Sequence, residues 1–252
     1  MNMDFPGNKT IYRGFERWDF TVAGVPAIVV APRKADLGLN WIWRAEFWDH
    51  EPGVDLALLD RGFHVVHLSV GNTFGCPSAM RKWDEFYAFL TNNFGFARKV
   101  ALEGLSRGGL YCYNWAADNP EKVSCIYADN PVCDFKSWPG GKGVGPGSVV
   151  DWQKLISDYN FASEAEALRW PLNPIDNLAP LARAGVPVLH VCGDADEVVP
   201  YQENSGLLGP RYRELGGDYR EIIKPGGMHH PHGLKDPLPV VDFIVGNAII
   251  GE

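Results

Sequence analysis

The chain has few of the features that mark proteins of membranes, nucleic acids or oxidising compartments. Its 252 residues carry a net charge of −8 without a cluster of Lys or Arg, which argues against binding to nucleic acid or to anionic membrane surfaces. No apolar run reaches the roughly 18 residues of a membrane-spanning helix. The five cysteines are an odd number and form no C-x-x-C pair, so we expect them to be reduced and structural.

The N-terminus and the length indicate a simple organisation. Residues 1–6 show neither the basic stretch nor the apolar core of a signal peptide, so we expect a cytoplasmic protein, with export left open if a leader has been trimmed. With 46% hydrophobic residues, the chain fits a single domain over residues 1–252. Residues 134–175 hold a glycine-rich loop and two short helical segments, which predict a small cap or lid insertion.

Segments with helix and strand patterns alternate after a β-rich start. That alternation predicts an α/β fold in which helices cover both faces of a mainly parallel, eight-stranded sheet. The predicted strands are residues 18–22, 26–31, 41–44, 63–70, 99–103, 123–129, 186–192 and 219–223. The predicted helices are residues 54–60, 77–92, 108–117, 151–157, 163–170, 177–184 and 239–248.

The main functional signal in the sequence is one pentapeptide, Gly104-Leu105-Ser106-Arg107-Gly108. A predicted strand leads into it and a predicted helix leads out, and strand, tight turn and helix are the context of a G-x-S-x-G nucleophile elbow. Glycine on either side of the serine matters because the turn is strained and a Cβ there would crowd it. The motif therefore predicts that Ser106 is a nucleophile.

A serine hydroxyl needs a histidine to take its proton and a carboxylate to orient that histidine. In this architecture both partners follow the serine along the chain, acid first, on loops after C-terminal strands. Residues 193–200 and 224–232 form two such loops at the edge of the sheet where the elbow lies. The candidates that they offer are Asp194 and Asp196 as the acid, and His229, His230 and His232 as the base.

With these motifs in this order, the chain resembles the α/β-hydrolase superfamily. Within it, the chain is similar to the prolyl-oligopeptidase-like and carbohydrate-esterase-like branches that lack a propeller, over nearly all residues from about 17 onward. The resemblance implies that Asp196, three residues after the glycine and four before the proline, is the acid. It also implies that His229, the first histidine after the glycine turn, is the base. We expect Asp194 to stabilise its turn instead.

Developing negative charge in the transition state needs two hydrogen-bond donors, which form an oxyanion hole. We expect the backbone N–H of Arg107 to be the first and the N–H of Ala45 or Glu46 to be the second. The side chain of Arg107 has two possible roles. It could help to hold the oxyanion, as the residue after the nucleophile does in the similar uronate-type carbohydrate esterases, or it could pair with a nearby carboxylate and brace the elbow.

The sequence says less about the substrate. Nine tryptophans are many, and aromatic faces suit sugar rings or acyl chains. We expect Trp138, in the glycine-rich insertion, to contact the ligand, and we name Arg44 and His230 as two further candidates for substrate binding. Arg44 is also expected to form a buried pair with Glu103 beneath the site.

These observations predict a cofactor-independent serine esterase. Ser106 would attack the carbonyl, His229 would carry the proton and Asp196 would orient His229. The expected substrate is a small acyl ester or a carbohydrate-linked carboxylic ester. A serine peptidase of prolyl-oligopeptidase-like type and a non-catalytic binding protein on a hydrolase scaffold are the alternatives.

A metal site is a weaker alternative. It would use His229, His230 and His232, with Asp194 or Asp196. Adjacent histidines rarely point to one centre, and the chain has no helical H-x-x-x-H pattern, so we expect neither a metal nor another cofactor. We also expect neither nucleic acid nor membrane as a partner.

Overall fold

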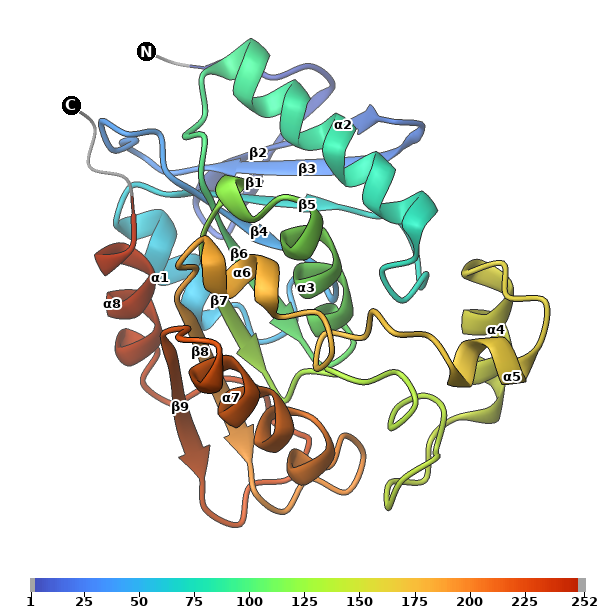
Figure 1. Cartoon of the computed structure of the whole chain (residues 1–252). Helices are drawn as coiled ribbons and strands as arrows, with labels where there is room; N and C mark the ends of the chain where they lie inside the picture. The colour runs from blue at the N-terminus through green and yellow to red at the C-terminus, as the bar shows by residue number, and fades with distance from the viewer. Residues whose placement is uncertain (1–2, 249–252) are drawn as a thin grey trace.

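A twisted sheet of nine strands runs through the described part of the chain, residues 3–248 of this computed structural model (Figure 1). Its strand order is β1-β2-β3-β5-β4-β6-β7-β8-β9. The first four strands in this order pair antiparallel, and the pairs from β5 to β9 are parallel. The strands are β1 (Asn8–Tyr12), β2 (Phe15–Val22), β3 (Val25–Ala31), β4 (Trp41–Arg44), β5 (His64–Leu68), β6 (Val100–Leu105), β7 (Val123–Asp129), β8 (Val188–Gly193) and β9 (Tyr219–Lys224).

The mainly parallel α/β-hydrolase sheet is confirmed, but the predicted count of eight strands is wrong. The additional strand is β1, which lies at the edge of the sheet and pairs only with β2. Four of its five residues are exposed, so it carries no buried apolar alternation that sequence inspection could detect.

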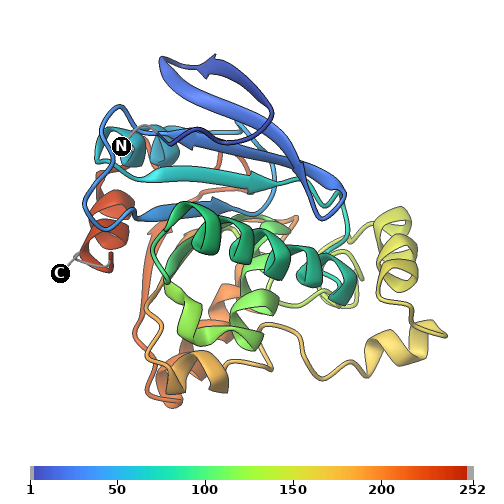
Figure 2. The same ribbon diagram turned by 90° about the horizontal axis from the view of Figure 1, so that it is seen from above.

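Helices cover both faces of the sheet, as the sequence predicts (Figures 1 and 2). One face packs against α2, α3, α6 and α7, and the other packs against α1 and α8. No helix among residues 3–248 is both long and apolar enough to cross a bilayer. The helices are α1 (Gly53–Asp60), α2 (Pro77–Phe94), α3 (Gly108–Asp118), α4 (Val149–Asp158), α5 (Glu164–Leu168), α6 (Ala179–Arg183), α7 (Ser205–Glu214) and α8 (Leu238–Gly246), with 3-10 turns η1 (Pro120–Lys122) and η2 (Tyr201–Glu203).

An aromatic cluster fills the larger of the two core layers. Trp43 of β4 stacks on Trp83 of α2 with ring centroids 4.0 Å apart, and Trp115 of α3 packs against both rings. Trp41 and Trp43 are almost fully buried. Burial of such large rings is a major source of stability, and it fixes α2 and α3 on the sheet. The elbow between β6 and α3 therefore rests on a rigid base.

Residues 134–175 leave the body of the domain on one side and carry the two predicted short helices, α4 and α5 (Figure 2). Hydrogen bonds attach the segment to the loop before α2. The Tyr159 hydroxyl donates to the Phe74 carbonyl at 2.9 Å, and the Asn72 amide donates to Asp151 at 3.0 Å. A role of this segment as a cap or lid stays a prediction.

Candidate active site

Ser106 lies at the turn between β6 and α3 with a backbone φ of +50°. This left-handed conformation is unfavourable for a residue with a side chain, so the surrounding structure must hold it in place. Its N–H donates to the Asp129 carbonyl at 2.9 Å, and its carbonyl accepts from Gly109 and Val132. A Cβ on Gly104 would lie 2.8 Å from the carbonyl group of Gly108, which explains the glycine at that position.

The structure brings the three predicted triad residues into one hydrogen-bonded chain. Ser106 Oγ lies 3.0 Å from His229 Nε2, and His229 Nδ1 lies 2.7 Å from Asp196 Oδ2. All three side chains are buried. Asp196 Oδ1 accepts from the N–H groups of Val198 and Val199, both at 2.9 Å, so the carboxylate has a fixed orientation. With its Nδ1–H donated to Asp196, the imidazole can accept the serine proton at Nε2.

Asn130, which the sequence analysis missed, connects the two loops that carry Asp196 and His229. Its side-chain amide donates to the His229 carbonyl at 2.9 Å, and its oxygen accepts from the Gly193 N–H at 2.7 Å. The residue follows β7 directly and has a φ of +42°. Its position at the carboxyl end of a parallel strand is the one sequence signal that could have identified it.

The alternative acid and bases are placed elsewhere. Asp194 Oδ1 accepts the N–H of Gly226 at 2.6 Å and so joins the two loops. His232 is buried, and its Nδ1 lies 2.7 Å from Asp129 Oδ1. His230 is exposed, with its ring centroid 4.8 Å from that of His229. The role of His230 in substrate binding stays a prediction.

The structure corrects one of the predicted oxyanion donors. The N–H of Ala45 donates to the Glu103 carbonyl at 2.9 Å, because the β4–β6 ladder continues one residue beyond Arg44. By contrast, the N–H groups of Glu46 and Arg107 meet no acceptor within residues 3–248. A Cβ on Gly108 would lie 3.8 Å from the Glu46 Cβ, so this loop approaches the start of α3 closely.

The side chain of Arg107 pairs with a carboxylate beside the elbow, which is the second of its two predicted roles. Its Nε donates to Glu46 Oε2 at 2.6 Å, and its guanidinium lies over the Phe47 ring, 4.8 Å from the centroid. Burial raises the pKa of the Glu46 carboxyl, and the Arg107 charge acts in the opposite direction. The ion pair ties the loop after β4 to the elbow, which keeps both N–H groups near Ser106.

The prediction that Arg44 binds substrate is wrong, because its side chain lies beneath the site. It is fully buried, and its Nη1 contacts Asp55 of α1 at 2.5 Å and Glu103 of β6 at 3.1 Å. Burial and the Asp55 charge raise the pKa of Glu103 well above its usual range. The expected pairing of Arg44 with Glu103 is present, because Arg44 Nη1 lies within hydrogen-bond distance of Glu103 Oε1.

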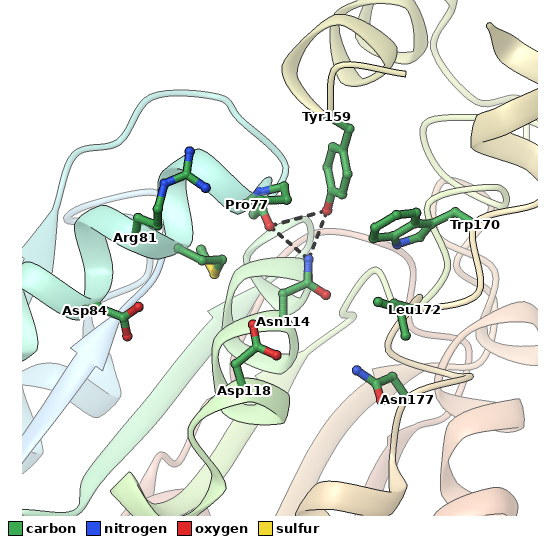
Figure 3. A pocket seen from close by; sticks show the side chains of 11 residues that line it. Pro77, Arg81, Asp84, Asn114, Asp118, Tyr159, Trp170, Leu172 and Asn177 are labelled. Carbon is green, nitrogen blue, oxygen red and sulfur yellow. Dashed lines mark hydrogen bonds between the residues drawn. The ribbon is translucent and has the colours of Figure 1, made fainter. Parts of the chain in front are cut away.

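A cavity of about 280 Å³ opens between α2, α3 and residues 159–177 (Figure 3). The Asn114 amide donates to the Tyr159 hydroxyl at 2.9 Å on its wall, and Trp170 lies beside them. None of the triad residues lines this cavity. Trp138 is partly buried, with its ring centroid 6.2 Å from that of Phe74. Contact between Trp138 and a ligand stays a prediction.

The fold and the elbow together define an α/β-hydrolase. Residues 85–237, which include the elbow and both later loops, match the model of the prolyl oligopeptidase family, and the chain belongs to this family. The prolyl-oligopeptidase-like resemblance is thereby confirmed.

The relatives found in the comparisons are longer proteins. Acylamino-acid-releasing enzyme 2 of Oryza sativa subsp. japonica is 28% identical over 157 residues, which cover 58% of this chain and 18% of that protein. An acylaminoacyl peptidase of Pyrococcus horikoshii superposes with a TM-score of 0.62 at 13% identity, over 86% of this chain and 37% of that one. A puromycin hydrolase superposes with a TM-score of 0.66 at 15% identity, over 91% of this chain and 37% of that one. None of these relatives supports the carbohydrate-esterase-like branch.

Proposed function

We propose that the chain is a serine hydrolase of peptidase type that cleaves acyl–amide bonds through an acyl-enzyme on Ser106. The observation that carries the proposal is the continuous hydrogen-bonded chain from Ser106 Oγ through His229 to Asp196. The relatives favour an amide over an ester, because one is named as an acylamino-acid-releasing enzyme and another as an acylaminoacyl peptidase. The peptidase alternative of the sequence analysis thus replaces the ester as the leading hypothesis.

The geometry suggests how each residue acts. Ser106 Oγ attacks the acyl carbon while its proton moves to His229 Nε2, and Asp196 stabilises the imidazolium that forms. The oxyanion accepts hydrogen bonds from the N–H groups of Arg107 and Glu46. His229 then protonates the leaving amine. A water molecule, deprotonated by the same imidazole, attacks the acyl-serine and releases the carboxylic acid.

Active-site labelling tests the nucleophile. We expect a fluorophosphonate probe to label the wild-type chain and to leave Ser106→Ala unlabelled. Ser124→Ala is the matched control, because Ser124 lies on β7 and, within residues 3–248, its hydroxyl hydrogen-bonds to the Cys125 sulfur, at 3.9 Å, and not to a triad residue. Equal labelling of wild type and Ser106→Ala would remove Ser106 as the nucleophile. An unlabelled and inactive wild type would favour the non-catalytic binding protein.

Paired substrates test the bond type. An N-acetylated amino acid p-nitroanilide and the p-nitrophenyl ester of the same acyl group present one acyl chain on two leaving groups. We expect turnover of both, because an ester is the easier acyl donor for the same triad. Ester turnover without detectable amide turnover would restore the predicted esterase and overturn the peptidase assignment.

A further inference from the structure

Three histidines from two distant parts of the chain meet beside the triad. His50, His230 and His232 each place one ring nitrogen within 4.8 Å of the others. We propose that these imidazoles bind a divalent transition-metal ion, with Zn²⁺ as the reference ion. The set differs from the one weighed in the sequence analysis, because His50 takes the place of His229 and no carboxylate takes part.

His232 is already oriented as a metal ligand. Its Nδ1 lies 2.7 Å from Asp129 Oδ1, so Nε2 is the nitrogen left for an ion. Asp129 is itself fixed by the Gly233 N–H at 2.9 Å, and Lys224 Nζ lies 3.5 Å from it. A carboxylate on the far nitrogen of a metal-binding histidine sets its tautomer and raises its basicity, and such a partner typically changes metal affinity 10–100-fold.

His50 reaches the cluster from a constrained loop. Phe47, Asp49 and Glu51 all have positive φ, between +49° and +64°. The buried guanidinium of Arg44 donates to the carbonyls of Phe47 and His50 and so holds the loop from below. This arrangement fixes the backbone of His50, while its exposed imidazole is free to turn.

The distances and the donor set define the ion class. Tetrahedral zinc with Zn–N bonds of about 2.0–2.1 Å needs nitrogens about 3.3 Å apart, so the cluster must contract. His50 and His230 are both exposed, and rotation of their side chains can supply the contraction while His232 stays in place. Three neutral imidazoles favour Zn²⁺, Ni²⁺ or Cu²⁺ over Mg²⁺ or Ca²⁺, which prefer oxygen ligands.

Binding can be measured independently of the proposed hydrolase activity. Titration of untagged Ser106→Ala protein with Zn²⁺ at pH 7.5, followed by calorimetry, reports the ion without catalysis. We expect one ion per chain and at least a tenfold weaker affinity when His50→Gln is added. Asp129→Asn should weaken binding 10–100-fold. Met228→Gln is the matched control, because this exposed side chain lies in the same loop and belongs to neither site.

Two results would overturn the proposal. One is the absence of Zn²⁺ binding at millimolar concentration, and the other is an affinity unchanged by His50→Gln in a protein with an unchanged melting curve. Since His50 is exposed, that variant should fold even if a buried His232→Gln variant does not. Visible absorption of bound Co²⁺ provides a second readout, which a tetrahedral site intensifies and His50→Gln should abolish.

Activity gives a separate measurement that also rests on the proposed function. The rings of His230 and His232 lie 4.8 and 5.0 Å from that of His229, so an ion between them places positive charge beside the catalytic base. We expect Zn²⁺ to inhibit amide hydrolysis, EDTA to reverse the inhibition, and His50→Gln to reduce it at least tenfold. A chain that binds Zn²⁺ but hydrolyses nothing would refute the hydrolase and keep the metal site.

Discussion

His229 and His232 lie on one loop and use the same structural device. Each places its Nδ1 2.7 Å from a buried carboxylate, Asp196 for the first and Asp129 for the second. Backbone N–H groups hold both carboxylates, those of Val198 and Val199 for Asp196 and that of Gly233 for Asp129. The two histidines differ at the other end of the ring. His229 Nε2 reaches the Ser106 hydroxyl, whereas His232 lies with His50 and His230.

The comparison shows that a histidine–carboxylate pair does not define a function by itself. The carboxylate fixes the tautomer and the orientation in both pairs, and the group that faces Nε2 decides the chemistry. We propose that the Ser106 hydroxyl, held at the strained elbow, makes the first pair part of a nucleophilic site, whereas the imidazoles of His50 and His230 make the second pair part of a metal site. Substitutions that act on one pair alone therefore test whether the two pairs have different functions.

The largest expected effect comes from removal of the Ser106 hydroxyl, which faces His229 and has no counterpart at His232. Ser106→Ala leaves both histidine–carboxylate pairs in place and removes the nucleophile, so we expect kcat for the amide substrate to fall by about 10⁶. The melting temperature should stay close to that of the wild type, since the turn keeps its backbone contacts. Single-turnover and steady-state assays measure the loss. A residual kcat above a hundredth of the wild-type value would contradict the assignment.

Substitution of Asp196 and of Asp129 compares the two histidine–carboxylate pairs directly. Asp196→Asn should lower kcat by about 10⁴, because the amide favours the wrong tautomer of His229. Asp129→Asn changes the partner of His232, and we expect less than a tenfold effect on kcat in metal-free buffer. The two variants are matched in chemistry and burial. Equal losses would show that the two pairs act as one unit.

The sequence predicted the triad because each of its residues belongs to a short local motif. The elbow glycines between a strand pattern and a helix pattern indicate Ser106, whereas the choice of Asp196 and His229 within their loops follows from the resemblance to the α/β-hydrolase superfamily. The strand–helix alternation, also a local pattern, predicted the central sheet. The segments that were missed have weak local patterns. β1 is mostly exposed, and α7 contains Pro210, which normally indicates the end of a helix.

The site residues that were predicted wrongly or missed are placed by contacts between separate segments of the chain. Ala45 loses its free N–H because the ladder with β6 extends past Arg44. Arg44 is buried because α1 brings Asp55 to it, a contact that no motif records. The position of His50 beside His230 likewise depends on the path of the loop after β4. Such contacts join residues far apart in the sequence, and spacing within one segment does not predict them.

A smaller effect is expected at Asn130, which supports the pair of His229 and Asp196. Asn130→Ala removes the hydrogen bonds to the His229 carbonyl and the Gly193 N–H and leaves these buried groups without a partner. We expect a loss of about 1–3 kcal/mol in stability and about a tenfold fall in kcat. Denaturant unfolding and steady-state kinetics measure the two. A fall in stability with full kcat would show that the triad geometry survives without this connection.

The smallest expected effect concerns histidines that have no carboxylate partner. Burial lowers the pKa of His64 and His67 to about 4 and that of His190 to about 3. The unfolded chain, with a histidine pKa of about 6.5, therefore binds more protons than the native state as the pH falls below 7. Each of the three should cost about 1 kcal/mol or less between pH 7 and pH 6.

Thermal unfolding at pH 7 and pH 6 measures this loss, and His64→Leu provides the comparison within the same protein. His64 packs against Phe96 with ring centroids 4.6 Å apart, and its Nδ1 has no hydrogen-bond partner among residues 3–248, so leucine preserves much of the apolar contact. We expect the variant to lose about a third of the pH-dependent change, because it removes one of three buried histidines that have no carboxylate partner. An unchanged dependence would show that His64 does not contribute to the loss of stability between pH 7 and pH 6.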